Sequence, residues 1–311
     1  MRQIKQPFLV TAFILFNALW CLAQSGMQID ERTAAYLEKF RADYIQSMLD
    51  KNPEIISSYY SEAIRLMPEF QKTILKKENA ILYHNAFFKR FDIAEYSREK
   101  MEIFNLGARI VEHGRFTLKM VSQQTKQEYL LNGKYQNIWE SLGDNSLQLL
   151  TEAWNYDHSV DFADQLRFNT IPSVCMALQP HLPIHSNISF ELAGLNALME
   201  LTIMEKDEKI WALFYADDGM SLHSFKPLVK GRKALDEYFE MHVDELPIFE
   251  KLDVRTDQID ELDGYVIEYA TAIANWRNDD YSGISTSKNI RIWRRAPNGT
   301  LKIFRLIAMY D

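Results

Sequence analysis

Apolar residues follow a helical period in some parts of the chain and a strand-like alternation in others, and this order occurs twice. In the first half, residues recurring every three or four positions predict helices at 33–49, 54–60 and 75–91. Alternating β-branched and aromatic residues then predict strands at 94–104, 108–122, 127–140 and 147–156. Helices followed by an antiparallel meander are typical of an α+β domain.

The second half repeats this order about 155 positions later. Helical periods predict helices at 189–206, 207–215 and 231–243. Alternation predicts strands at 252–260, 265–277, 285–295 and 300–310. Two α+β domains are therefore predicted, at 30–157 and 189–311, each with three helices packed on an antiparallel four-strand sheet.

Segments without a sustained period separate these elements. Residues 158–188 contain three prolines and predict a linker, with a short helix at 161–167. Residues 61–73 predict irregular structure or a short strand. Ala216-Asp217-Asp218-Gly219 has the composition of a turn, which accounts for the two carboxylates better than a metal or acid pair does.

Composition restricts the class of partner. The chain has 311 residues, of which 47% are hydrophobic and 13% aromatic, so it can bury two cores. Its formal net charge is -8 and it has no basic cluster, which argues against nucleic acid as a partner. It also lacks a glycine-rich phosphate loop and the spacing of a zinc site. No cofactor and no metal are therefore expected.

The N-terminus has the pattern of a signal peptide. Arg2 and Lys5 precede an apolar run from Pro7 to Leu22, and small residues allow cleavage after Ala23. The sequence therefore predicts a signal peptide at 1–23, export to the periplasm or the exterior, and no membrane span after cleavage. An uncleaved anchor is the alternative. Cys175 would be the only cysteine of the mature chain and is expected to be buried.

Phe214-Tyr-Ala-Asp-Asp-Gly219, then Val229-Lys-Gly-Arg-Lys-Ala-Leu235, then Tyr238 resemble the nuclear transport factor 2-like superfamily, in particular its SnoaL-like and ketosteroid-isomerase-like members. The resemblance occurs once in each half, and the two copies together cover nearly all of residues 30–311. It implies cone-shaped domains in which a curled sheet wraps around helices and an apolar pocket. It also implies that the two sheets can pair as an internal pseudo-dimer. Members include isomerases, cyclases, dehydratases and domains without catalysis, so the fold does not decide the function.

The resemblance places only part of an isomerase site in each half. Proton transfer beside a carbonyl needs a base near the carbon and hydrogen-bond donors at the oxygen. In the first half the oxygen-binding positions fall on Tyr44 and near Asn137, but the base position falls on Pro68, which cannot act as a base. Glu152 and Trp154 share one strand face, so they are candidates to line the same pocket.

In the second half the resemblance places His223 at the base position and Arg291 near the second donor position. His223 is a plausible base because the usual pKa of histidine lies near neutrality. Met199, which cannot donate a hydrogen bond, occupies the tyrosine position. Neither half has a complete set, which argues against the isomerase mechanism in either pocket.

Three hypotheses remain at this point. The leading one is an exported protein that binds a small apolar or aromatic molecule without isomerase chemistry. The second is an isomerase, cyclase or dehydratase-type enzyme with His223 as base and Arg291 as its electrostatic partner. The third is a structural or protein-interaction module with filled pockets. They differ in whether His223 and Arg291 point into an open cavity of ligand size.

Overall fold

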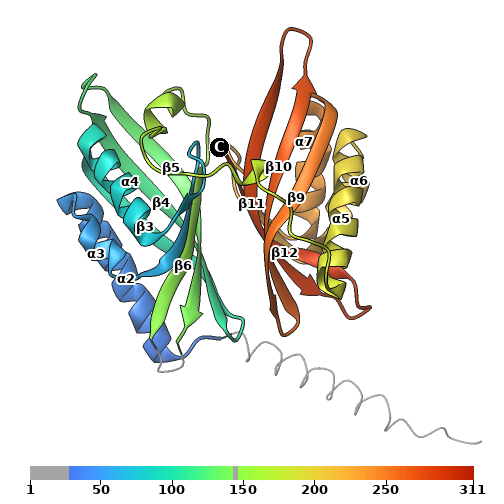
Figure 1. Ribbon diagram of the computed structural model, residues 1–311, viewed down its shortest axis with the longest axis horizontal. Coiled ribbons are helices and arrows are strands. Elements are labelled where there is room, and N and C mark those ends of the chain that lie inside the picture. Colours follow the sequence, from blue (N-terminus) through green and yellow to red (C-terminus); the bar gives the residue numbers. More distant parts are fainter. Residues whose placement is uncertain (1–27, 143–145) are drawn as a thin grey trace, which may run out of the picture.

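The computed structural model describes residues 28–142 and 146–311, which form two α+β domains in tandem. Figure 1 shows the two sheets facing each other, with the helices on the outer sides. Each domain has three helices, as the apolar periods predict: α2 (Glu31–Asp50), α3 (Pro53–Ser57) and α4 (Lys77–Arg90), then α5 (Asn187–Met204), α6 (Glu208–Leu213) and α7 (Arg232–Glu245). The predicted signal peptide lies outside the described residues.

The two sheets have the same topology. The first has the order β2-β1-β6-β5-β4-β3 and the second the order β8-β7-β12-β11-β10-β9. The strands of the first sheet are β1 (Tyr60–Pro68), β2 (Ile74–Leu75), β3 (Phe91–Asn105), β4 (Arg109–Ser122), β5 (Glu128–Ser141) and β6 (Leu147–Tyr156). Those of the second are β7 (Tyr215–Leu222), β8 (Val229–Lys230), β9 (Ile248–Leu262), β10 (Tyr265–Arg277), β11 (Ser282–Arg295) and β12 (Leu301–Tyr310).

Each sheet contains the four predicted antiparallel strands and two more. The additional strands β1 and β7 pair in parallel with the last strand of their domain, and each also pairs with a two-residue strand. The turn predicted at 216–219 is therefore wrong, because these residues lie within β7. Tyr215 and Met220 on either side of this polar stretch pair with β12 across a register shift, and the two aspartates are exposed, where the Asp218 carboxylate pairs with Arg294.

Local polar contacts set the boundaries of the first helices. The Asp30 side chain accepts a hydrogen bond from the Thr33 amide at 2.7 Å and caps the start of α2. Lys51 ends this helix in the left-handed region, with φ at 55°. Pro53 then occupies the first position of α3. An amide hydrogen at this position would make no hydrogen bond within the helix, so proline is tolerated there.

The predicted linker packs against the first domain. Leu166 and Phe168 are buried in the first core, which lies between the helices and the sheet. Val174 forms a β-bridge with Thr73. The short helix expected at 161–167 is a 3₁₀ turn at Ala163–Leu166. Cys175 is buried, as predicted.

A third hydrophobic cluster lies between the two sheets and joins the domains. It contains Met67, Val111 and Ile138 from the first sheet and Ile267 and Ile290 from the second. Its members are nearly all inaccessible to solvent. Burial of apolar surface on this scale stabilises the interface in the way that a domain core is stabilised.

The contacts across this interface obey an internal twofold symmetry. Lys134 Nζ donates to the Lys226 carbonyl at 2.7 Å, and Lys288 Nζ donates to the Gln71 carbonyl at 2.6 Å. The lysines and the acceptors occupy equivalent positions of the two halves, about 155 residues apart. In a dimer with twofold symmetry, residue i of each subunit contacts residue j of the other. The two halves of this chain make the same kind of reciprocal contact within one molecule.

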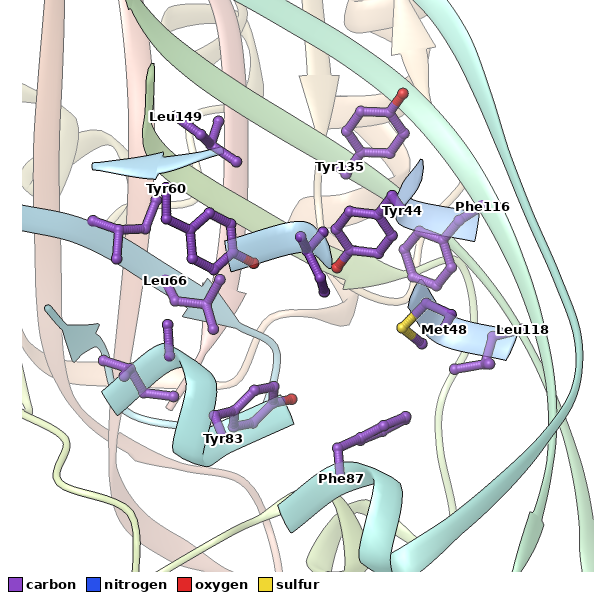
Figure 2. Packing of buried hydrophobic residues seen from close by; sticks show 14 of the residues in the cluster. Tyr44, Met48, Tyr60, Leu66, Tyr83, Phe87, Phe116, Leu118, Tyr135 and Leu149 are labelled. Carbon is purple, nitrogen blue, oxygen red and sulfur yellow. The ribbon is translucent and has the colours of Figure 1, made fainter. Parts of the chain in front are cut away.

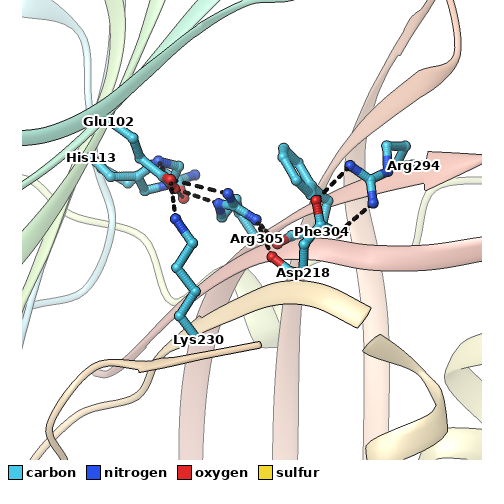
Figure 3. Close-up of polar contacts among 8 residues, drawn as sticks. Glu102, His113, Asp218, Lys230, Arg294, Phe304 and Arg305 are labelled. Atoms are coloured by element: carbon cyan, nitrogen blue, oxygen red, sulfur yellow. Dashed lines mark hydrogen bonds and ion pairs between the residues drawn. The ribbon is translucent and has the colours of Figure 1, made fainter. Parts of the chain in front are cut away.

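A charged cluster lies at one end of the same interface (Figure 3). Glu102 of β3 accepts hydrogen bonds from Arg305 of β12 and from Lys230 of β8, the latter at 2.9 Å. His113 Nδ1 lies 3.6 Å from the same carboxylate. One carboxylate of the first domain therefore pairs with two cations of the second.

Candidate functional site

The first cone is filled by an arginine. Arg98 of β3 is buried, and its guanidinium donates to Glu152 at 2.9 Å and to Asn137 at 3.2 Å. The Tyr44 and Tyr135 ring centroids lie 4.0 Å and 3.8 Å from the guanidinium carbon. The arrangement combines a buried ion pair with two cation–π contacts. Arg98 thus occupies the centre of the cone.

Little space remains around Arg98. Tyr44, Glu152 and Trp154 line a residual cavity of about 40 Å³. Figure 2 shows aromatic side chains, among them Tyr44 and Tyr83, packed around this region. A volume of about 40 Å³ holds a few water molecules at most. The first domain therefore has no open cavity of ligand size at the predicted positions, and Arg98, Glu152 and Asn137 there bond to one another.

The second cone encloses a cavity of about 750 Å³. This volume lies within the range of small-molecule sites. Apolar side chains from the helices and from the sheet form most of its wall, among them Met199, Ile203, Trp211, Phe249, Leu252, Val254, Trp276 and Leu306. Three predicted residues, Met199, His223 and Arg291, line this cavity.

Smaller side chains at equivalent positions explain why the second cone is open. Arg98 pairs with Phe116 across β3 and β4, whereas the equivalent pair across β9 and β10 is Val254 and Ala272. Both replacements remove volume from the interior. Tyr135 of β5 corresponds to Asn289 of β11, which removes a further ring. The second cone therefore lacks the side chains that fill the first.

Polar atoms without partners gather in the wall of this cavity. Asn289 and Arg291 lie two positions apart on β11, so their side chains share a face of the sheet. Asn289 Oδ1, Arg291 Nε and His223 Nε2 are buried and have no hydrogen-bond partner within 28–142 and 146–311. Buried polar atoms are normally bonded, so these three atoms mark the polar part of the cavity wall.

The charge of Arg291 is already matched. Its Nη1 donates to the Asn196 side chain and lies 3.4 Å from Glu268 Oε2. Glu268 is fully buried and also accepts from Trp293 Nε1 at 2.8 Å and from Thr256 Oγ1 at 2.6 Å. The guanidinium and the carboxylate together carry no net charge, so this part of the cavity is polar and neutral.

His223 enters the cavity wall directly after β7 and carries no charge at neutral pH. Burial lowers the pKa of His223 to about 3, and the nearby His242 and Lys134 act in the same direction. Its ring packs on Tyr238 and His242, at centroid distances of 5.6 Å and 6.0 Å. No carboxylate of the described chain orients the imidazole. The role of His223 as a base stays a prediction. Its low pKa would make the imidazole a weak base.

Sequence reasoning missed the two groups that define these interiors. Arg98 and Glu268 both lie inside predicted strands, where an isolated charge reads as a solvent-facing position. The available signal was strand parity, since Arg98 lies two residues from Tyr96 and Glu268 two from Val266. Parity alone cannot show which face is enclosed by the curl of the sheet.

Two further features of the described residues concern ligands and membranes. No group of three or more histidine, cysteine, aspartate or glutamate side chains is placed to hold a metal ion in the described ranges. Within the same ranges, no helix has both the length and the apolar character needed to cross a bilayer.

Comparison with known proteins finds similar solved structures, each matching about one domain's length of the chain. No protein-family model matches the chain, and no curated protein does. A ketosteroid isomerase-like protein from Erwinia carotovora atroseptica is 11% identical over 42% of this chain and 100% of its own, with a TM-score of 0.39. A nuclear transport factor 2-like superfamily protein from Salmonella enterica is 9% identical over 41% and 93%, with a TM-score of 0.36.

A protein from Catenulispora acidiphila, solved in complex with S-DNPA, is also similar. It is 15% identical over 41% of this chain and 96% of its own, with a TM-score of 0.34. The structural neighbours are thus nuclear transport factor 2-like and ketosteroid isomerase-like proteins. Each of these three covers about two fifths of this chain.

Proposed function

We propose that the second domain binds a small neutral molecule with an apolar or aromatic body and an oxygen-bearing polar end. The observation that carries this proposal is the contrast between the two cones. A cavity of about 750 Å³ is open in the second, whereas Arg98 and its partners fill the first. An open, mainly apolar cavity with a few polar groups is the usual form of a small-molecule site.

In this proposal the two parts of the ligand contact different parts of the cavity wall. The apolar body packs between the α5 side, at Met199 and Ile203, and the sheet, at Val254. The polar end lies near Asn289 and Arg291, which both line the cavity and whose Oδ1 and Nε atoms have no partner among the described residues. Because Glu268 already matches the Arg291 charge, a buried carboxylate would remain uncompensated.

Binding can be measured with prodan, a neutral naphthalene ketone whose fluorescence reports an apolar environment. Wild-type protein is expected to bind it. Ala272→Phe, which introduces the side chain found at the equivalent first-domain position, occupies part of the cavity and is expected to weaken binding. Ala272→Ser is the matched control and keeps the cavity open. Equal binding by wild type and Ala272→Phe would contradict the proposed site.

The charge preference has its own test. 2-Acetonaphthone and 2-naphthoate have the same ring system, but the first carries a neutral ketone and the second a carboxylate. The ketone is expected to displace prodan roughly tenfold better, because the carboxylate has no second cation in the deep part of the cavity. Stronger displacement by 2-naphthoate would show that the cavity accepts anions.

We also propose that the protein is exported, on the strength of the pattern at residues 1–23. Cell fractionation and the intact mass of the recovered protein test this. Export with cleavage gives the mass of a chain whose first residue is Gln24. A full-length mass in the membrane fraction would instead favour the uncleaved anchor.

A further inference from the structure

A carboxyl group of the first domain reaches the wall of the second domain's cavity. Glu69 directly follows β1 and is 1% exposed. Its Oε1 accepts a hydrogen bond from the Tyr310 amide at 3.0 Å, and its Oε2 lies 2.5 Å from Ser224 Oγ. Tyr310 and Ser224 both line the cavity, and Ser224 is the neighbour of His223. One side chain thus contacts two parts of the wall.

The geometry around Ser224 indicates that Glu69 holds a proton. Ser224 Oγ lies within hydrogen-bonding distance of two acceptors, Glu69 Oε2 at 2.5 Å and the Ala308 carbonyl at 2.9 Å. A hydroxyl has one hydrogen and can donate to only one of them. If Glu69 is protonated, it donates to Ser224 Oγ, which in turn donates to Ala308. Both close oxygen–oxygen contacts of Ser224 then contain one hydrogen each, in addition to the hydrogen bond that the Ala308 carbonyl accepts from Asn155 Nδ2 at 2.7 Å.

The charges that face Glu69 leave it without an ion partner. Lys288 of β11 and Lys134 of β5 are cations that attract the carboxylate without bonding to it. Lys288 Nζ is bonded to Asp311 at 2.9 Å and Lys134 Nζ to Asp157 at 2.6 Å. Burial outweighs these cations and raises the pKa of Glu69 to about 7.

The backbone beside Ser224 also needs support. Phe225 has a φ of 61°, a left-handed conformation that costs a residue other than glycine free energy. Its amide donates to the Tyr156 carbonyl of the first domain at 2.8 Å, and its ring stacks on Phe70 and Tyr310. The segment that carries His223 is therefore held from the first domain at two points.

We propose that protonated Glu69 is a positioning residue for the second domain's cavity, so that the first domain sets the ligand affinity of the second. It fixes the segment 223–224 and the end of β12, which together form one side of the wall. This inference rests on the proposed function of the cavity. The filled first cone thereby acts as a support for the open one.

Two substitutions at Glu69 test this with prodan as the probe. Glu69→Ala removes both contacts and is expected to weaken prodan binding on the order of fivefold to tenfold, the effect of one or two lost hydrogen bonds. Glu69→Gln keeps an acceptor for the Tyr310 amide and a donor for Ser224. It is expected to restore wild-type affinity and to abolish any change in affinity between pH 6 and 8.

The control is Glu102→Gln, which weakens the interface at Arg305 and Lys230, both away from the cavity wall. It should leave the prodan affinity unchanged. Wild-type affinity in Glu69→Ala would overturn the positioning role, and equally weak binding by Glu69→Gln would overturn the protonated state. Loss of affinity in Glu102→Gln would assign the effect to general loosening of the interface and would also overturn it.

Amide hydrogen exchange keeps the test independent of the ligand. Faster exchange at residues 223–225 and at Tyr310 is expected in Glu69→Ala and not in Glu69→Gln. If wild-type protein binds no prodan, the proposed function fails while the exchange result still decides the role of Glu69. Unchanged exchange in Glu69→Ala would overturn the inference.

Discussion

Single side chains decide which of the two cones is open. Arg98 lies in the first cone between two tyrosine rings and pairs with Glu152, whereas Val254 takes its place in the second. The wall of an otherwise similar fold therefore becomes a packed core or a cavity through a few substitutions on one face of the sheet. Cavity volume is set by the sum of side chains that meet in space, and for that reason neither cone's state could be predicted from the sequence.

Removing Arg98 is expected to destabilise the first domain strongly. Arg98→Ala leaves Glu152 buried without a cation, which costs about 3–5 kcal/mol in the free energy of unfolding. The double variant Arg98→Met with Glu152→Gln removes both charges and is expected to recover most of that loss. Urea denaturation measures both. A loss below about 1 kcal/mol in Arg98→Ala would show that the ion pair contributes little.

The stability of the protein is expected to fall as the pH rises toward neutrality because of Glu69. Its folded-state pKa of about 7 lies above the ordinary value of 4.5, so the folded protein holds a proton that the unfolded chain releases. The contribution is largest below pH 4.5 and is lost as the pH rises to about 7, on the order of 3 kcal/mol in all. Glu69→Gln should flatten this part of the stability curve, and Glu128→Gln, on the exposed surface, should not.

At the scale of elements, the long periodic segments could be predicted and the short polar ones could not. All six helices and the eight long antiparallel strands appear where the apolar pattern places them. The strand β7 was not recognised, and β1 was expected only as one of two alternatives, because both carry polar residues and a register shift and become strands by pairing with β6 and β12. That pairing is a long-range effect, which local composition does not contain.

Replacing glycine with alanine is expected to have opposite effects on stability at two positions in different elements. An added Cβ at Gly194, on the exposed side of α5, meets no atom within 4 Å, so Gly194→Ala should stabilise the helix by about 1 kcal/mol. In β5, a Cβ at Gly133 would lie 2.3 Å from the Asn155 carbonyl, so Gly133→Ala should destabilise the sheet. Thermal unfolding compares the two, and a melting temperature lowered by Gly194→Ala would contradict the first prediction.

The whole molecule is expected to unfold as one unit in spite of its two domains. The cluster between the sheets is fully buried, and polar contacts join the domains around it. Separating the domains would expose this surface, so neither is expected to persist alone. Calorimetry should therefore show a single transition with equal calorimetric and van't Hoff enthalpies. Two resolved transitions would show that the interface does not couple the domains.

The twofold arrangement within one chain removes a restriction that a dimer of identical subunits must obey. Glu69 and Ser224 occupy equivalent positions of the two halves and face each other across the interface. In a dimer of identical chains the same place would hold two glutamates or two serines. Joining the halves in one polypeptide allows the two sides to differ, so one copy can specialise as a rigid frame while the other keeps a hollow interior.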